Sequence, residues 1–305
     1  MAINPLIQSA SAALNDILLG KTEQVNRALC CILARGHLLV EDIPGMGKTT
    51  LSHALAATLG LSYNRIQFTS DLLPADVLGF SMYDKEAGDL VFHKGPVFAQ
   101  VILADEINRA SPRTQSALLE AMEERQVSIE GETRPLPEPF FVIATQNPLD
   151  QGGTFPLPES QLDRFLMRLR LGYPDSRAER ELLLGQDRRE MISAMKPALT
   201  REQLMQLQQQ VESVTVSESL LDYVQRILTY SREIPGVLYG LSPRAGLGLL
   251  RATRAWALMD GRSHALPDDV QAILPNILEH RLVDDHHHRQ ESLTQRILND
   301  VPVIV

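Results

Sequence analysis

The sequence predicts an α/β domain with a parallel sheet flanked by helices, followed by an all-α domain. Apolar runs at 38–40, 101–104 and 140–145 are expected to be strands, and the second lacks alternation, as in a central parallel strand covered on both faces. After Tyr173-Pro174-Asp175 the remaining patterns are helical. We therefore expect an α/β domain over residues 1–172 and a helical domain over residues 173–305.

A glycine-rich loop between the first strand and the next helix indicates a phosphate site. The stretch 37–50, HLLVEDIPGMGKTT, has the order strand, loop, helix. Its glycines let several backbone N–H groups point inward, and the helix N-terminus adds a partial positive charge. In the P-loop signature Lys48 reaches the β- and γ-phosphates and the Thr49 hydroxyl binds Mg²⁺. We therefore expect ATP and Mg²⁺ as cofactors, with the nucleotide on Pro44, Gly45, Met46, Gly47, Lys48, Thr49 and Thr50.

Two features around this loop leave alternatives open. Asp42 stands where the signature GxxxxGK[ST] has its first glycine. A merely structural glycine-rich turn is the alternative, although GMGKTT directly after an apolar strand argues against it. Residues 5–35 are expected to form two helices around Gly20-Lys21, which lie either beside an adenine ring or in plain packing.

Two acidic residues at a strand end supply the second half of the expected site. Asp105 and Glu106 follow the strand at 101–104. Asp105 can bind Mg²⁺, directly or through water, and Glu106 can orient and polarise the water that attacks the γ-phosphate. The structural alternative is that the two acids only pair with Arg109 or Arg113.

Asn147 and Arg244 are further candidates for contact with the phosphates. Asn147 follows the strand at 140–145 and could hydrogen-bond the γ-phosphate or the attacking water, although an asparagine before a proline is more often a turn residue. Arg244 is expected in the first turn of a helix, where a cation opposes the helix dipole. A nearby anion would explain it, and pairing with a carboxylate of the helical domain is the alternative.

The remaining pattern predicts two hairpins and a helical array. Hairpins are expected at 79–94, around a turn at 85–88, and at 127–136, around Glu130-Gly131. A short helix broken by Pro74 and a helical segment at 96–100 are expected on either side of the first hairpin. An alternating edge strand is expected at 165–171, and helices at 176–190, 200–212, 217–232, 243–260, 267–280 and 289–299.

Composition limits the classes of function. The chain has 305 residues, a formal net charge of −9 and a pI near 5.4, which disfavours broad binding to nucleic acid phosphates without excluding a local basic groove. It has no apolar run long enough for a membrane span and no secretory N-terminus, so a soluble, cytoplasmic protein is expected. The adjacent Cys30 and Cys31 suit neither a disulfide nor a metal site. His286–His288, with His280, could bind a metal, but successive histidines point in different directions and a solvated loop is favoured.

Several separate motifs occur in a characteristic order: GMGKT, VILADE, a hairpin, ATQN, LDRF and LSPRA, with a helical lid after them. The set resembles the MoxR family of AAA+ ATPases over nearly the whole chain. The resemblance implies a P-loop AAA+ core followed by an all-α lid, with 79–94 as the helix-2 insert and 127–136 as the pre-sensor-1 hairpin. The site residues that it implies are Lys48 and Thr49 of Walker A, Asp105 and Glu106 of Walker B, Asn147 as sensor 1, Arg164 as the arginine finger and Arg244 as sensor 2.

This resemblance also implies a mechanism and a cellular task. Hydrolysis is expected in a homo-oligomeric ring, expected to be a hexamer, where Arg164 completes the site of a neighbouring subunit and Arg244 contacts the γ-phosphate of its own chain. Members of the family are chaperone-like ATPases that mature or activate protein complexes, often with a partner that carries a von Willebrand factor A domain and sometimes during metal-cofactor insertion. The acidic charge favours protein clients over the alternative, a motor on nucleic acid. A nucleotide switch without turnover is opposed by Glu106.

Overall fold

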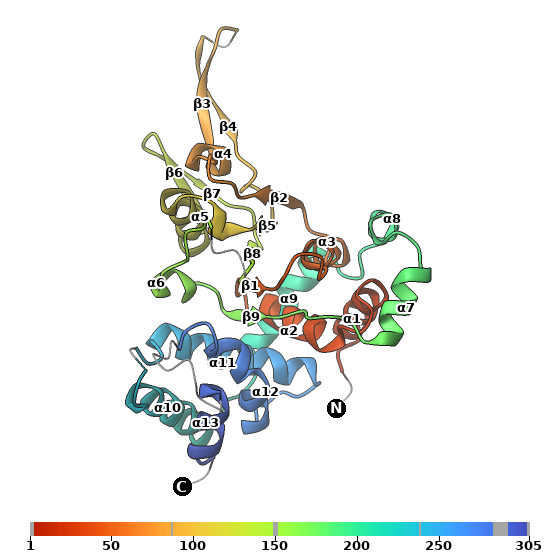
Figure 1. Cartoon of the computed structure of the whole chain (residues 1–305), viewed down its shortest axis with the longest axis vertical. Helices are drawn as coiled ribbons and strands as arrows, with labels where there is room; N and C mark the ends of the chain where they lie inside the picture. The colour runs from red at the N-terminus through yellow and green to blue at the C-terminus, as the bar shows by residue number, and fades with distance from the viewer. Residues whose placement is uncertain (1–2, 87, 149–151, 238, 283–291, 304–305) are drawn as a thin grey trace.

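The computed structural model describes residues 3–86, 88–148, 152–237, 239–282 and 292–303. Its centre is a five-stranded sheet in which all neighbouring strands are parallel, with the order β2-β5-β8-β1-β9 (Figure 1). The three inner strands are buried, as their apolar sequences predict. The predicted α/β fold is therefore confirmed, with strands β1 (Leu38–Glu41), β2 (Tyr63–Gln67), β5 (Val101–Asp105), β8 (Phe141–Gln146) and β9 (Met167–Leu169).

Successive residues of each strand point to opposite faces of the sheet, and a separate hydrophobic cluster covers each face. One cluster joins Leu38, Leu103 and Ile143 to the helices α1 (Pro5–Ile17), α2 (Thr22–Leu33) and α3 (Lys48–Thr58) and to the helices of the C-terminal part. The other joins Leu39, Ile102 and Val142 to α5 (Pro112–Glu124). The sheet is thus covered by helices on both faces, which holds the ends of its strands in fixed positions.

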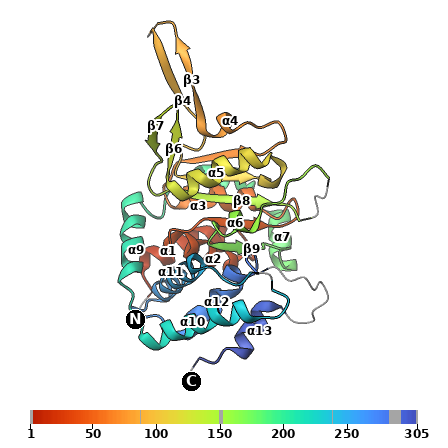
Figure 2. The same cartoon turned by 90° about the vertical axis from the view of Figure 1, so that its left-hand side faces the viewer.

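Both predicted hairpins are present. Strands β3 (Gly79–Asp84) and β4 (Asp89–Lys94) form the first, and β6 (Gln126–Ile129) and β7 (Glu132–Pro135) form the second. Figure 2 shows that both project beyond α5 toward the same end of the molecule.

Two short segments on either side of the first hairpin differ from the prediction. Pro74 does not break a helix but begins one, α4 (Pro74–Leu78), because its missing N–H is harmless at the first helical position. Residues 96–100 are turns and bends instead of a helix. The reason is that the Val97 N–H donates to the Val77 carbonyl, 3.2 Å away, so this backbone is bonded to α4 and not to itself.

The C-terminal part is helical, as predicted, with one helix divided in two. The expected helix at 176–190 is two helices, because Gly185 ends the first and the Asp187 carboxylate caps the second by accepting from the Arg189 N–H. Two short helices lie between strands of the α/β part, η1 (Ile107–Arg109) and α6 (Glu159–Leu162). The helices after β9 are α7 (Ser176–Leu184), α8 (Arg188–Ala194), α9 (Arg201–Ser213), α10 (Glu218–Glu233), α11 (Pro243–Met259), α12 (Pro267–Leu278) and α13 (Leu293–Asp300).

The helices after residue 175 lie in two places. Helices α7 and α8 lie beside α1 and α3, whereas α10 to α13 gather at the opposite end from the hairpins (Figure 1). The predicted domain boundary near residue 173 follows the last strand of the sheet, and as a domain boundary it stays a prediction.

Three remaining expectations concern single features. Cys30 and Cys31 are buried, free thiols. His286–His288 lie outside the described residues. Within the described ranges, no helix combines the length and the apolar content that crossing a bilayer requires.

Candidate nucleotide site

The loop between β1 and α3 has the backbone of a phosphate cradle. Gly45 and Gly47 have φ angles of 87° and 91°, in the left-handed region that glycine adopts without strain. A Cβ added at either glycine would meet no atom within 4 Å, so the loop is open on that side. Lys48 begins α3, and its Nζ donates to the Asp42 carbonyl at 2.6 Å. The helix N-terminus and the loop N–H groups can therefore bind an anion, with Lys48 beside it.

Asp42, which stands in place of the first glycine of the signature, joins this loop to the segment after β9 by hydrogen bonds. Its carboxylate accepts from the Ile43 N–H at 2.9 Å and from the Gly172 N–H at 2.7 Å. Beside it, Lys21 Nζ donates to the three carbonyls of residues 171–173, each within 3 Å. Burial lowers the pKa of Lys21, and the negative charge of Asp42 partly opposes that shift. The departure from the signature thus has a structural explanation.

Asp105 ends β5 as a buried carboxylate held on both oxygens. Its Oδ1 accepts from the Thr145 hydroxyl at 2.6 Å, and its Oδ2 accepts from Arg65 Nη2 at 2.6 Å. Mg²⁺ prefers oxygen ligands and usually binds through one or two protein oxygens together with phosphate oxygens and water. The carboxylate of Asp105 and the exposed hydroxyl of Thr49 are donors of this kind, so their chemistry fits Mg²⁺.

Glu106 has an unusual backbone conformation directly after β5. Its φ of 58° is left-handed, a conformation that non-glycine residues adopt mainly where the surrounding structure holds them. Its N–H donates to the Thr145 hydroxyl at 2.9 Å, and its Oε2 accepts from Gln67 Nε2 at 3.0 Å and lies 3.2 Å from Arg109 Nε. The pairing with Arg109, which was the structural alternative, is therefore present. The role of Glu106 in orienting water stays a prediction.

Three partners of these acids were not identified from the sequence. Arg65 lies in the middle of β2 and Gln67 at its end, β2 being the strand next to β5, and Thr145 lies near the end of β8. Thr145 carried a weak signal, because its hydroxyl stands near the carboxyl end of a predicted strand, where the other expected site residues also lie. Arg65 and Gln67 carried no comparable signal.

The strand order places Asn147 between the two halves of the site. Strand β8 lies between β1 and β5, with Gln146 opposite Glu41. Asn147 follows directly and is buried. Its position between the P-loop strand and the strand of Asp105 is compatible with a contact to the γ-phosphate, and that role stays a prediction.

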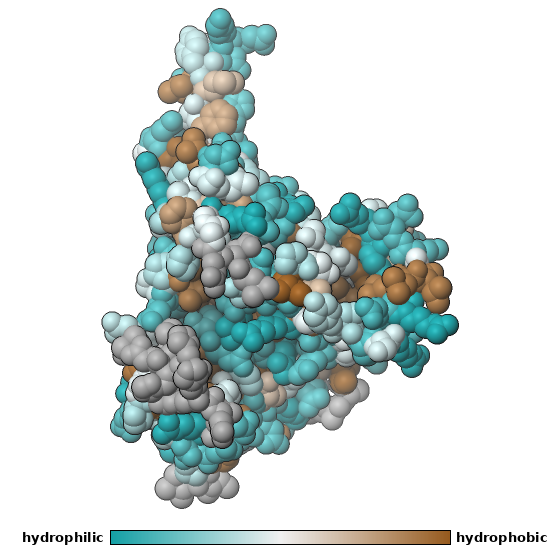
Figure 3. Space-filling model, viewed as in Figure 1, coloured by the Kyte–Doolittle hydropathy of each residue, from teal (hydrophilic) through white to brown (hydrophobic). Residues whose placement is uncertain are grey.

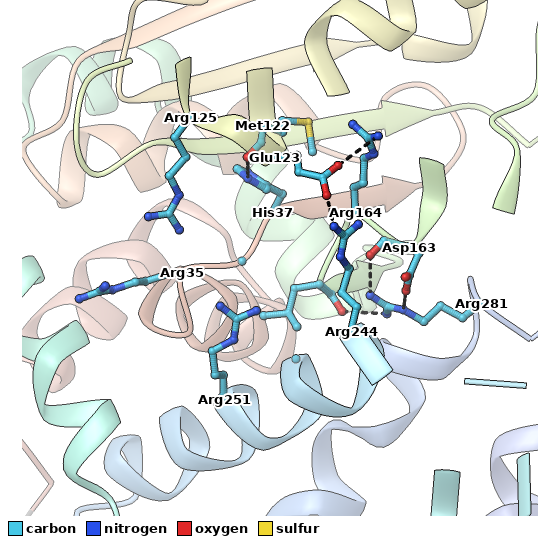
Figure 4. Close-up of a pocket in the computed structure, with 13 residues that line it drawn as sticks. Arg35, His37, Met122, Glu123, Arg125, Asp163, Arg164, Arg244, Arg251 and Arg281 are labelled. Carbon is cyan, nitrogen blue, oxygen red and sulfur yellow. Dashed lines mark hydrogen bonds and ion pairs between the residues drawn. The ribbon is translucent and has the colours of Figure 1, made fainter. Parts of the chain in front are cut away.

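Arg164 and Arg244 lie side by side (Figure 4), at the end of the sheet where the strands begin. Arg164 Nη1 donates to the Leu119 carbonyl at 2.6 Å, and its Nη2 is 3.1 Å from one carboxylate oxygen of Glu123. Arg244 pairs with the other oxygen of Glu123. The carbonyl of Met122, the residue before Glu123, accepts a hydrogen bond from the ring of His37, which directly precedes β1. The two arginines therefore lie where β1 begins, and the P-loop lies where β1 ends.

In this structure Arg244 pairs with Glu123 and lies away from the P-loop of its own chain, so its expected contact with the γ-phosphate of that chain stays a prediction. Helix α11 packs against Leu166 through Gly248, where an added Cβ would lie 2.8 Å from the Leu166 side chain. This contact places the first turn of α11 near the beginning of β1. The alternative was pairing with a carboxylate of the helical domain, and here the structure differs, because the paired carboxylate, Glu123, belongs to α5 of the α/β part.

Comparisons with known proteins agree with this fold. Residues 37–167 match the family described as "ATPase family associated with various cellular activities (AAA)", and residues 230–301 match the "AAA lid domain". The crystal structure of a protein assigned as an ATPase in Cytophaga hutchinsonii superposes with a TM-score of 0.88 at 35% identity, covering 97% of this chain and 94% of that one. The fold and the site define an ATPase of the AAA+ class.

Relatives narrow this class to a family. The chain is 44% identical to the uncharacterized protein YeaC of Bacillus subtilis, over 92% of this chain and 88% of that protein. It is 40% identical to chaperone MoxR1 of Mycobacterium tuberculosis, over 91% and 75% of the two chains, and 33% identical to protein MoxR of Paracoccus denitrificans, over 96% and 93%. The chain belongs to the MoxR family of AAA+ ATPases.

Proposed function

We propose that copies of this chain form a ring in which ATP is hydrolysed between two neighbouring copies. One observation carries the proposal. Lys48, Asp105 and Glu106 lie at the carboxyl ends of the strands, and Arg164 and Arg244 lie at their beginnings. Arginines on that edge can face a triphosphate held by the next copy, whereas the P-loop of their own chain lies at the other edge. Each site would therefore need two copies.

Each side chain has a role in the proposed site. The P-loop residues 44–50 bind the phosphates, with Thr49 and Asp105 as the residues that would hold Mg²⁺. When bound, the metal neutralises charge on the phosphate oxygens. Glu106 orients the attacking water, and Asn147 contacts that water or the γ-phosphate. Arg164 and Arg244 of the neighbouring copy stabilise the charge that develops on the γ-phosphate.

The magnitudes support a phosphate as the final partner of Arg164. An arginine that acts in this way in related phosphoryl transfer contributes on the order of 10³ to 10⁵ in rate, or roughly 4 to 7 kcal/mol of transition-state stabilisation. The ion pair with Glu123 is partly exposed on both sides and contributes about 1 kcal/mol or less. A phosphate can thus displace Glu123 at small cost.

Protein clients agree better with the surface of the first hairpin than nucleic acid does. Phe80, Met82, Tyr83 and Leu90 of this hairpin are between 48% and 62% exposed, and apolar side chains are visible along it in Figure 3. Exposed apolar groups at a projecting tip suit a protein surface, whereas a phosphate backbone would require cations. We therefore propose a chaperone-like activity that matures or activates protein complexes. A partner with a von Willebrand factor A domain and a task in metal-cofactor insertion belong to this proposal through the family resemblance.

A trapped variant tests the proposal. Glu106→Gln should bind ATP, assemble and hold its client, which can be captured and identified by mass spectrometry. Lys48→Ala, which should not bind ATP, is the matched control and should capture much less of the same proteins. Hydrolysis by Glu106→Gln at the wild-type rate would exclude its role. Stimulation of ATP hydrolysis by DNA that persists at high salt would favour the nucleic acid alternative.

A further inference from the structure

Three arginines beside the proposed site have no part in the proposed reaction. Arg35, Arg125 and Arg251 line the same cavity as Arg164 and Arg244, with a volume of about 200 Å³. They come from the end of α2, the end of α5 and the middle of α11. Figure 4 shows their side chains around one side of the cavity, and the Glu123 ion pairs on the other. Segments far apart in the chain thus bring three arginines to the lining of one cavity.

The cavity carries an excess of positive charge. Its two carboxylates are already paired, because Glu123 holds two arginines and Asp163 accepts from Arg281 Nε at 2.7 Å. In the part of the chain that the structure describes, no carboxylate pairs with Arg125 or Arg251. Arg35 has a contact of 3.4 Å with Glu212, which does not line the cavity. The lining arginines are Arg35, Arg125, Arg164, Arg244, Arg251 and Arg281.

Arg251 is repelled by the other two unassigned arginines. The pKa of Arg251 is lowered first by burial and then by the charges of Arg125 and Arg35. Such repulsion is unfavourable as long as no anion lies between the groups. An anion in the cavity would remove it and would be attracted by all three guanidinium groups.

Two of these arginines also occupy strained backbone positions. Arg35 and Arg125 have φ angles of 54° and 53°, each just after a helix, where glycine is the usual residue. Among the described residues the other non-glycine residues with positive φ are Glu106, in the proposed site, and Glu130, in a hairpin turn. A cation at a helix C-terminus is favoured by the helix dipole, but that attraction does not require the left-handed position itself. Strain of this kind is typical of functional sites.

We propose that Arg35, Arg125 and Arg251 form a binding site for a phosphoryl oxyanion. A guanidinium group presents paired N–H donors that match two oxygens of a phosphate, and three such groups suit a multiply charged anion better than a single carboxylate. The phosphate can come from a free compound in solution or from the nucleotide of a neighbouring copy. The second source rests on the proposed ring, and the first does not.

Binding of inorganic pyrophosphate to the full chain tests the first source. The chain carries Lys48→Ala, so that the P-loop does not contribute, and binding is measured by calorimetry. We expect one site per chain that weakens about tenfold or more with Arg251→Gln and with added salt. Arg254→Gln, on the same helix and outside the cavity lining, is the matched control and should bind normally.

Arg125→Gly separates loss of the site from loss of the fold. Glycine relieves the left-handed backbone, so this variant should melt at the same or a higher temperature and still bind pyrophosphate about tenfold more weakly. A variant with lower stability and unchanged binding would contradict the proposal.

ATP-dependent assembly tests the second source. In a Glu106→Gln chain, Arg251→Gln should raise the protein concentration needed for assembly with ATP about tenfold, while ATP binding to single chains stays unchanged. If Arg251→Gln loses pyrophosphate binding, the site takes a free phosphate compound. If Arg251→Gln loses ATP-dependent assembly, the site takes the nucleotide of a neighbouring copy. If Arg251→Gln changes neither, the proposal is overturned. Weaker assembly without nucleotide would overturn it too, because it would show an acidic surface as the partner. If the chains do not assemble at all, the proposed ring fails and the pyrophosphate result still decides.

Discussion

The carboxylate of Glu123 in α5 forms an ion pair with Arg244 in the first turn of α11. The pair joins the α/β part to the helical part, and the second oxygen of Glu123 is taken by Arg164. One negative charge therefore serves two guanidinium groups that the family resemblance assigns to the γ-phosphate. The remaining positive charge is free to attract a phosphate from a neighbouring copy.

Arg164→Ala should leave ATP binding near normal and lower hydrolysis about 10³-fold, because the side chain acts on the transition state of a neighbouring site. Binding is measured with a fluorescent nucleotide and hydrolysis by phosphate release. Mixing Arg164→Ala with Lys48→Ala, each inactive alone, should restore part of the activity, since some junctions then contain an intact Lys48 and an intact Arg164. Full activity of dilute, single Arg164→Ala chains would exclude the role.

The same mixing experiment decides on which copy Arg244 acts. Arg244→Ala combined with Lys48→Ala should regain hydrolysis, because the structure places Arg244 beside Arg164 at the beginning of β1. If Arg244 acts on the nucleotide of its own chain, Arg164→Ala mixed with Arg244→Ala should instead be the active combination. Phosphate release from mixtures of known ratio distinguishes the two results.

Glu123→Gln should make ATP-dependent assembly easier. Without its charge, the two arginines no longer have to leave a carboxylate before they meet a phosphate, and a partly exposed ion pair of up to about 1 kcal/mol corresponds to a roughly two- to fivefold lower concentration for half-assembly. Light scattering against protein concentration measures this midpoint. Glu120→Gln, an exposed glutamate on the same helix, should leave it unchanged. A higher midpoint for Glu123→Gln would show that the carboxylate positions the arginines.

Asp42→Ala should destabilise the folded chain by about 1 to 2 kcal/mol, because the Gly172 N–H loses its acceptor. It should also weaken ADP binding several-fold, since the P-loop is no longer tied to the backbone after β9. Urea unfolding and calorimetry measure the two effects. Asp42→Asn keeps one acceptor oxygen and should lie between the wild type and Asp42→Ala. Equal stability of all three proteins would contradict the structural explanation of Asp42.

Burial lowers the pKa of His37 to about 4, because its ring lies in the interior, where it accepts from the Val142 N–H. The unfolded chain therefore binds a proton that the folded chain does not, between about pH 6.5 and pH 4. The free energy of unfolding should fall by roughly 3 kcal/mol through this group as the pH decreases over that range.

His280 is buried with a lowered pKa and adds to the same trend, so the decisive quantity is the difference between variants. His37→Gln should show a shallower loss of stability below pH 6.5 in urea unfolding. His264→Gln, at an exposed position, should follow the wild type. Identical pH profiles for wild type and His37→Gln would contradict the assigned burial effect.

Much of the nucleotide site could be predicted because its signals are local. The GMGKTT loop, the acids after VILA and the asparagine after FFVIATQ each follow an apolar strand, and parallel strands end at one edge of a sheet. The partners of these groups could not be predicted in the same way. Arg65 reaches Asp105 only because β2 pairs with β5, a fact of strand order that the local pattern around Arg65 does not contain.

The inner strands, both hairpins and the glycine-dependent loop can be predicted from the sequence, because each depends on neighbours a few residues away. The start of α4 at Pro74 and the break after Gly185 were not predicted. The tertiary structure alone decided that Arg244 meets Glu123 and that Arg35, Arg125 and Arg251 surround one cavity. These contacts join residues from distant segments, and the close packing of Gly248 on Leu166 sets the place of α11, which carries Arg244 and Arg251. Such packing decides which end of the sheet an arginine on a helix reaches. A pattern along the sequence does not contain this information.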